Sequence, residues 1–226
     1  MKKNMEKMFK CLATGSSGNC YILNLGGGYI LLDAGIPVVK IIDNINANDI
    51  VFACVSHQHQ DHKKSMGELM KRRVQVFYGG DNERTKSTRY KKHRIIQIPI
   101  SHGDCINNAF VIQYEDECIL YATDFNLCEY DLSEFKFTRV IVECNYVESM
   151  IQINDIKTKR QINTHMGLEG LKIFLDNLNL SKCREIDLVH MSQQFGSGVI
   201  MGSSIYARYK IRTGVCKKFG GVAYYG

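Results

Sequence analysis

The apolar positions of this chain fall into short runs separated by polar and glycine-rich turns. Most runs are rich in β-branched residues, which is typical of buried strands. Other segments repeat their apolar residues at helical spacing, as Leu168, Leu171 and Leu175 do. We therefore expect helices at about 37–46, 63–73 and 166–179, and strands at 10–13, 20–25, 29–33, 49–56, 74–78, 95–100, 109–114, 118–123, 139–144 and 185–189.

Residues that can bind metals stand where several of these strands end. His57, His102, Asp124 and His190 each follow an apolar run. Strands of one sheet can deliver such residues to a shared edge, as they do in many α/β proteins. We therefore expect these four side chains to converge on one place.

The densest group of candidate ligands is His57-Gln58-His59-Gln60-Asp61-His62. In an extended segment the side chains of residues i and i+2 point to the same face, so His57 and His59 can bind one ion together. Asp61 and His62 follow where the chain turns into a helix, so they can reach a second position close by. Zinc and related ions take such ligands in catalytic sites. A solvated polar loop is the disfavoured alternative, because the whole chain has only seven histidines.

The composition is that of a folded, one-domain protein. The chain has 226 residues, of which 45% are hydrophobic and 23% charged, so it can bury a substantial core. No apolar run approaches the ~18 residues of a membrane span. The basic N-terminus is not followed by a signal-peptide pattern, so we expect a cytoplasmic protein. Nine cysteines without a C-x-x-C pair indicate reduced core thiols, and a net charge of +6 permits an anionic substrate.

Two segments give a less definite prediction. The basic run 84–94 is interpreted as a solvated surface, the alternative being a patch for a phosphate backbone with Tyr90 available to stack on bases. The segment after Ser192 is rich in Gly, Lys, Arg and Tyr and predicts no clear element. We therefore expect one domain over residues 1–226, with a core at about 9–192, a last strand at 185–189 and a C-terminal tail at 193–226.

The segment His57–His62 resembles the signature of the metallo-β-lactamase-fold hydrolases, which usually bind two metal ions. The resemblance implies an α/β fold, the four-layer αβ/βα sandwich, in which two mixed sheets pack face to face with helices outside. It implies two divalent ions, with zinc expected and manganese or iron as alternatives. The implied ligands are His57, His59 and His102 for the first ion, Asp61, His62 and His190 for the second, and Asp124 shared by both.

Two other aspartates take roles from the same resemblance. Asp61 is also expected to orient the hydroxide that the ions form from water. Asp33, in Leu31-Leu32-Asp33, resembles a familiar aspartate of the superfamily and is interpreted as an outer partner of the ligands or a structural residue. Gly103 stands where relatives often have an aspartate, which leaves Asp104 without an assigned role.

The second half of the chain favours one branch of this superfamily. The order Asp124, Glu143, His165, His190 resembles that of RNase Z, the tRNA 3′-processing endonucleases, in which a glutamate orients a histidine that protonates the leaving oxygen. A phosphodiester that is cleaved by hydroxide leaves an alkoxide, so a general acid is useful there. The alternative is a histidine that caps the helix at 166–179 and an unrelated glutamate.

The N-terminal half most resembles the YycJ-like group, compact proteins of this fold that are associated with DNA metabolism. The resemblance rests on Thr14-Gly15-Ser16-Ser17-Gly18-Asn19 and Leu31-Leu32-Asp33-Ala34-Gly35. Ser16, Ser17 and Asn19 are candidates for contact with substrate phosphate, the alternative being a plain tight turn. The chain has no room for a β-CASP domain and no long insertion like the tRNA-gripping arm of RNase Z.

These observations predict a metal-dependent phosphodiesterase, a nuclease that acts on DNA or RNA with metal-bound hydroxide as the nucleophile. The close alternative is a phosphodiesterase of phage type that degrades cyclic-nucleotide immune signals. Weaker alternatives are a thioester or lactone hydrolase and a non-catalytic metal-binding partner protein. A homodimer is left open, because relatives often form dimers.

Overall fold

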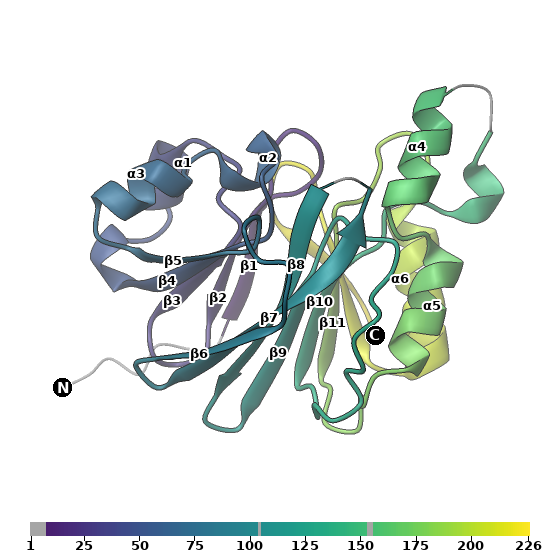
Figure 1. Cartoon of the computed structure of the whole chain (residues 1–226). Helices are drawn as coiled ribbons and strands as arrows, with labels where there is room; N and C mark the ends of the chain where they lie inside the picture. The colour runs from purple at the N-terminus through teal and green to yellow at the C-terminus, as the bar shows by residue number, and fades with distance from the viewer. Residues whose placement is uncertain (1–7, 104, 153–155) are drawn as a thin grey trace.

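Two β-sheets dominate the computed structural model, which describes residues 8–103, 105–152 and 156–226 (Figure 1). The first sheet contains five strands in sequence order. Strands β1 to β3 form an antiparallel meander, whereas β3, β4 and β5 run parallel. The elements of this half are β1 Met8–Ala13, β2 Cys20–Asn24, β3 Tyr29–Leu32, α1 Val38–Ile42, a 3₁₀ turn Ala47–Asp49, β4 Ile50–Val55, α2 Gln60–Lys63, α3 Met66–Lys71 and β5 Gln75–Tyr78.

The second sheet contains eight strands in the order β13-β12-β11-β10-β9-β8-β7-β6. Strands β6 to β9 pair antiparallel, and β9 to β12 run parallel. Its elements are β6 Lys86–Tyr90, β7 His93–His102, β8 Cys105–Tyr114, β9 Glu117–Ala122, β10 Arg139–Glu143, a 3₁₀ turn Glu148–Met150, α4 Ile156–Thr164, α5 Leu168–Asp176, β11 Glu185–Val189, α6 Gly198–Tyr209, β12 Arg212–Cys216 and β13 Val222–Tyr225.

Three clusters of buried side chains hold these elements together in four layers. Phe52 of the first sheet and Phe110 of the second lie in the cluster between the sheets. Ile41 of α1 and Leu69 of α3 cover the outer face of the first sheet, and Leu171 of α5 belongs to the cluster on the outer face of the second. Helices therefore lie on both outer sides (Figure 1). This arrangement is the four-layer αβ/βα sandwich that was predicted.

The chain after Ser192 is an integral part of the second sheet, so the predicted core of about 9–192 and the tail 193–226 are corrected. Met201 and Ile205 of α6 lie in the core beside that sheet, and β12 pairs in parallel with β11. The strand at 185–189 is therefore not the last one. The sequence pattern did not predict β12, because this strand is only five residues long and contains Gly214, a residue type that is depleted in strands.

The basic run 84–94 forms edge strand β6 and its turn into β7, and most of its basic side chains are exposed. Lysine and arginine on an edge strand hinder pairing with another sheet, which agrees with the predicted solvated surface. Tyr90, however, is not free to stack on bases. Its ring is half-buried and packs edge-on against Phe52 and Phe77, with centroids 6.2 and 5.9 Å away.

The helix expected at 63–73 is divided into α2 and α3. Ser65 lies at the break, where its backbone N–H donates to the carbonyl of Ala34 at 2.8 Å and its hydroxyl donates to the carbonyl of Ile36 at 2.5 Å. These bonds hold the break against the loop after β3. Among the described residues, no helix is long and apolar enough to cross a membrane. The nine cysteines are free thiols. Asp104 and the basic N-terminal residues 1–7 lie outside the described residues.

Candidate metal centre

Three candidate site residues stand in the left-handed backbone region directly beyond strands. Asp33 follows β3 with φ 57°, Asp124 lies after β9 with φ 51°, and His190 follows β11 with φ 53°. This conformation is uncommon for residues other than glycine and is concentrated at functional sites. Each strand thus turns sharply, at the edge of the sandwich where α2 lies (top of Figure 1), and leaves a polar side chain there.

A first group of donor atoms comprises His57, His59, His102 and Asp124, whose ligand atoms lie within 4.8 Å of one another. His57 Nε2 lies 2.8 Å from His59 Nδ1 and 3.8 Å from Asp124 Oδ2. His102 Nε2 is also 3.8 Å from Asp124 Oδ2. Ligand atoms at ~2.0–2.2 Å from a tetrahedral zinc ion are about 3.4 Å apart, so modest adjustment fits this group to such an ion.

A second group comprises Asp61, His62 and His190. His62 Nε2 lies 3.5 Å from Asp61 Oδ2 and 3.4 Å from Asp124 Oδ2, so Asp124 adjoins both groups. His190 Nε2 points the same way, 3.9 Å from Asp61 Oδ2. It is buried and has no hydrogen-bond partner among the described residues. An unsatisfied imidazole nitrogen beside a second imidazole and two carboxylates suits coordination of a cation.

Each buried ligand histidine is held by a hydrogen bond to its other ring nitrogen. Such outer partners fix the tautomer and the orientation of metal-binding histidines. In each of the four buried histidines the nitrogen with this outer partner is Nδ1, so Nε2 faces the donor groups. The contacts are His57 to Ser56 Oγ at 3.0 Å, His62 to Asp33 Oδ2 at 2.5 Å, His102 to the Thr164 carbonyl at 3.1 Å and His190 to Glu143 Oε1 at 2.9 Å.

Asp33 is the most connected of these outer partners. Besides His62, its buried carboxylate accepts from the Ser56 backbone N–H at 2.7 Å and from the Tyr121 hydroxyl at 2.5 Å. It therefore ties the ligand loop after β4 to the second sheet. Asp33 thus belongs to neither donor group, and its role as an outer partner of the ligands stays a prediction.

The loop between β1 and β2 supports the second group from behind. The Asn19 backbone N–H donates to the Asp61 carbonyl at 2.7 Å, and Asn19 Nδ2 lies 3.0 Å from His62 Nε2. Asn19 is fully buried, so it holds the ligand loop in place. It was predicted to contact substrate phosphate, but in this position it does not face a substrate. Ser16 and Ser17 are exposed on the same loop, and their contact with phosphate stays a prediction. At Gly35, a Cβ would lie 1.7 Å from the Asp61 carbonyl, so glycine is required there.

The electrostatics of the site favour cations. Burial lowers the pKa of His57 to about 2, which leaves the neutral imidazole that a metal requires. His190 is buried as well, but Asp124, Asp61 and Glu143 outweigh burial and raise its pKa to about 10. Within the described part of the chain, no lysine or arginine forms an ion pair with these carboxylates. Divalent ions would supply the missing positive charge, so the donor set fits them.

Glu143 and His165 form a hydrogen-bonded pair beside both donor groups. His165 Nδ1 lies 2.7 Å from Glu143 Oε1, the same oxygen that His190 contacts. The His165 ring stacks on His190 with centroids 5.2 Å apart and lies 5.3 Å from His102. Burial opposes protonation of His165, but the charge of Glu143 and its hydrogen bond raise the pKa of His165 above its usual value.

Two residues that hold His190 in place were not found from the sequence. Asn145 donates to the His190 carbonyl at 2.8 Å and accepts from Gln161 Nε2 at 2.6 Å. Thr14 Oγ1 accepts from the His190 backbone N–H at 2.8 Å. Asn145 stands two residues after Glu143 at the end of a predicted strand, which is the signal that could have identified it. Thr14 opens the motif Thr14–Asn19, but its contact with His190 spans most of the chain and could not be inferred from that motif.

Comparison with known proteins supports this picture of the fold. Residues 13–96 match the model of the metallo-β-lactamase superfamily, whereas no curated protein matches the chain. YhfI of Bacillus subtilis, a metallo-β-lactamase-fold protein, has a TM-score of 0.71 at 16% identity, over 97% of this chain and 100% of YhfI. The short form of human tRNase Z has a TM-score of 0.63 at 13% identity, over 82% and 93%. A diphosphatase from the PhnP family has a TM-score of 0.60 at 12% identity, over 96% of both chains.

The chain therefore has the metallo-β-lactamase fold, as predicted. At one edge of its sandwich lies a His/Asp cluster suited to binding divalent metal. The closer resemblance to the YycJ-like group stays a prediction.

Proposed function

We propose that this protein is a dinuclear metal-dependent phosphodiesterase, a nuclease that hydrolyses DNA or RNA. The observation that carries the proposal is the Glu143–His165 pair, which places a positioned proton donor beside the metal ligands. A β-lactam, thioester or lactone hydrolase has less need of such a pair. The two donor groups and Asp124 would hold two ions, zinc first, with manganese or iron as alternatives.

Bound divalent ions supply two kinds of chemistry here, since they lower the pKa of water towards ~7 and neutralise charge on a phosphoryl group. The protein residues then divide the remaining work. Asp61 is 24% exposed, so its carboxylate can accept a hydrogen bond from the attacking water and orient it. Asp124 is almost fully buried, so it shapes the site and does not meet the substrate.

His165 supplies the proton for the leaving oxygen in this scheme. Its Nδ1–H donates to Glu143 Oε1, so Nε2 is the nitrogen left to face a substrate. The side chain is 16% exposed, which gives it access to a bound phosphodiester. Because Glu143 raises the pKa of His165, more of the imidazolium is present near neutral pH. General acids placed in this way contribute typically 10²–10⁴-fold in rate.

The names of two structural neighbours agree with a substrate that contains phosphate. One is a tRNase and the other a diphosphatase. Identities of 12–13% carry only the fold, so the substrate class is proposed from the residues of this chain.

Mass-spectrometric product analysis tests the proposal. The metal-loaded protein is incubated with single- and double-stranded DNA, RNA and cyclic nucleotides. Asp61→Ala is the inactive variant, and Asp116→Ala, at an exposed turn between β8 and β9, is the matched control. We expect the wild type and Asp116→Ala to release mononucleotides or short oligonucleotides, and Asp61→Ala to release none.

Two other results would redirect the assignment. Hydrolysis of cyclic nucleotides alone would make the protein a signal-degrading phosphodiesterase. If folded protein with two bound ions attacked none of these substrates, the phosphodiesterase proposal would be wrong, and thioesters would be tested next.

A further inference from the structure

A basic groove of about 560 Å³ is lined in part by the loop between β1 and β2, the loop that also contacts residues of the metal centre. Its walls come from β1, from α1 and the residues on either side of it, and from the turn between β12 and β13. Lys10, Lys40 and Lys218 contribute three positive charges, and Asp43 contributes the one negative charge among the lining residues. The Lys10 ammonium donates to Asn44 Oδ1, a neutral partner, at 2.7 Å. Within the described ranges none of the three lysines forms an ion pair, so the groove carries uncompensated positive charge.

An exposed aromatic ring stands at the lip of this groove. Phe219 is 88% exposed, more than the other exposed large hydrophobic side chains of the described residues. The ammonium of Lys218 lies 5.2 Å from the centroid of its ring. An exposed phenyl ring gains nothing from folding, and aromatic rings beside lysines are typical of surfaces on which bases stack.

The turn that carries Phe219 is held in place by the first sheet. The Gly221 backbone N–H donates to the Cys11 carbonyl at 3.0 Å. At Gly220, whose φ is 96°, a Cβ would lie 3.0 Å from the Leu12 carbonyl, so the turn sits directly on β1. The backbone of the turn that carries Phe219 is therefore fixed on β1 at the edge of the groove.

The groove and the metal centre share a wall. Ser17, in the loop between β1 and β2, lines the groove. In the same loop, Thr14 accepts from the His190 backbone and Asn19 donates to the Asp61 carbonyl. A nucleotide chain with one phosphodiester at the metal centre would therefore reach the groove by crossing this loop.

We propose that this groove binds single-stranded nucleic acid next to the bond to be cleaved, with Lys10, Lys40 and Lys218 on its phosphates and Phe219 stacked on a base. This inference rests on the proposed function, because it names the polymer as the substrate. The basic run 84–94 offers charge as well, but the ring of its Tyr90 is packed against Phe52 and Phe77.

Fluorescence anisotropy with labelled 20-nucleotide DNA and RNA strands tests the groove. All proteins carry metal and Asp61→Asn, so that the strands stay intact. We expect Phe219→Ala to weaken binding about 5- to 100-fold, as loss of one base–aromatic stack does. We expect Lys10→Gln/Lys40→Gln/Lys218→Gln to reduce the slope of log K against log salt by about 2, at ~0.7 for each lost phosphate contact.

The matched control is Lys86→Gln/Arg89→Gln/Lys92→Gln, which removes the same charge from the exposed run at β6. This control leaves all the groove residues in place, so it should change the affinity for the strands less than the variant that replaces the three groove lysines. If the control weakened binding and the groove variants did not, or if no strand bound, the groove assignment would be overturned.

Hydrolysis of bis(p-nitrophenyl) phosphate separates this inference from the proposed function. In proteins with Asp61 intact, Phe219→Ala should leave that rate unchanged, because the small ester does not reach the groove. If the protein bound strands through the groove but hydrolysed no phosphodiester, the groove assignment would stand and the proposed nuclease function would be wrong. Cleavage of strands that the groove variants did not affect would refute the groove alone.

Discussion

The two ends of the β-sandwich both gather carboxylates, but they balance them in opposite ways. At the end that carries the candidate metal centre, Asp33, Asp61, Asp124 and Glu143 face histidines, and no described lysine or arginine pairs with them. At the other end, arginines are bound directly to Glu117, Glu185 and Asp187. Carboxylates thus pair with arginines at one end, whereas at the other end they lie among histidines in a cluster suited to binding divalent metal.

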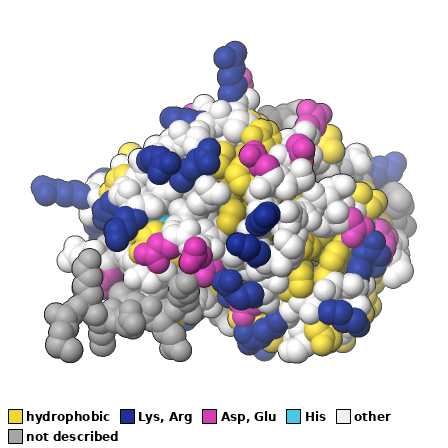
Figure 2. All heavy atoms as spheres, turned by 90° about the horizontal axis from the view of Figure 1, so that it is seen from below, with side chains coloured by type: hydrophobic (Ala, Val, Ile, Leu, Met, Phe, Trp, Pro, Cys, Tyr) yellow, Lys and Arg dark blue, Asp and Glu magenta, His cyan; other side chains and the backbone are white. Residues whose placement is uncertain are grey.

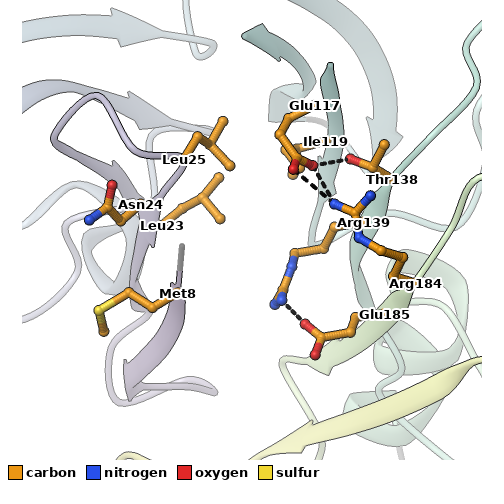
Figure 3. Close-up of a pocket in the computed structure, with 10 residues that line it drawn as sticks. All are labelled: Met8, Leu23, Asn24, Leu25, Glu117, Ile119, Thr138, Arg139, Arg184 and Glu185. Atoms are coloured by element: carbon orange, nitrogen blue, oxygen red, sulfur yellow. Dashed lines mark hydrogen bonds and ion pairs between the residues drawn. The ribbon is translucent and has the colours of Figure 1, made fainter. Parts of the chain in front are cut away.

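Ion pairs hold the arginine-rich end of the sandwich together. Figure 3 shows its 270 Å³ pocket between the sheets, with Met8, Leu23 and Leu25 on one wall and ion pairs on the other. Arg139 contacts Asp187 at 2.7 Å and also contacts Glu185. Seen from this side, basic and acidic side chains are interspersed over the surface (Figure 2). The pocket therefore lacks the unbalanced charge that would attract a metal ion.

The largest effect should follow from removing the proton donor. We expect His165→Ala to lower kcat for phosphodiester hydrolysis about 10²- to 10⁴-fold, because the leaving oxygen loses its acid. Metal content should be retained, since His165 lies outside both ligand groups of the proposal. Steady-state kinetics and metal analysis of the same samples measure this. A wild-type rate in His165→Ala would show that the pair has no catalytic role.

Removal of metal should also destabilise the protein. A chelator would leave the carboxylates of the metal centre without their cations, and ligand binding in 100-fold excess over Kd is worth ~2.7 kcal/mol. For a chain of this length that corresponds to a fall in Tm of about 5–10 °C. Scanning calorimetry with and without chelator measures the shift. If the Tm did not change in protein shown to have lost its metal, bound cations would not be what stabilises the carboxylates of the metal centre.

Asp187 should make stability depend on pH at the opposite end. Burial raises its pKa to about 6 although Arg139 pulls it down, so the folded state holds a proton that the unfolded state, with a pKa of ~3.9, has lost. Stability should therefore fall as pH rises from about 4 to 6, by up to about 3 kcal/mol, and change no further above that window.

Asp187→Asn cannot titrate and serves as the reference. Urea unfolding of both proteins between pH 4 and 7.5 should show the wild type losing stability relative to the variant as pH rises. A difference that stayed constant over this range would show that Asp187 is ionised in the folded protein throughout.

The smallest effect is expected for the exposed arginine at this end. Arg184 is 63% exposed and binds Glu117 at 2.6 Å. The Glu117 carboxylate is buried, but it also accepts from the Thr138 hydroxyl at 2.6 Å. Arg184→Gln should therefore lower the free energy of unfolding by about 1.5 kcal/mol, the value of one hydrogen bond to a charged group. Chemical denaturation measures it. A loss of several kcal/mol would mean that the Glu117 carboxylate depends on this one arginine.

The sequence predicted the fold and the gathering of the site residues better than it predicted how they are held. His57–His62 and the strand ends were visible because hydrophobic runs stop there. The hydrogen bonds from Thr14 to His190 and from Tyr121 to Asp33 join residues 176 and 88 positions apart, so no local pattern could indicate them. Strand β12 was missed for a different reason. Its own residues have little tendency to form a strand, and it is a strand because it pairs with β11.

Inductively coupled plasma mass spectrometry can count the metal ions bound to protein that has been loaded with zinc and then dialysed. The donor groups around His57 and His190, with Asp124 between them, predict two ions in each chain. Asp61→Ala should retain fewer, because it removes a ligand of the second group only. Folded wild-type protein that retained no zinc, manganese or iron would contradict the assignment of this end of the sandwich as a metal centre.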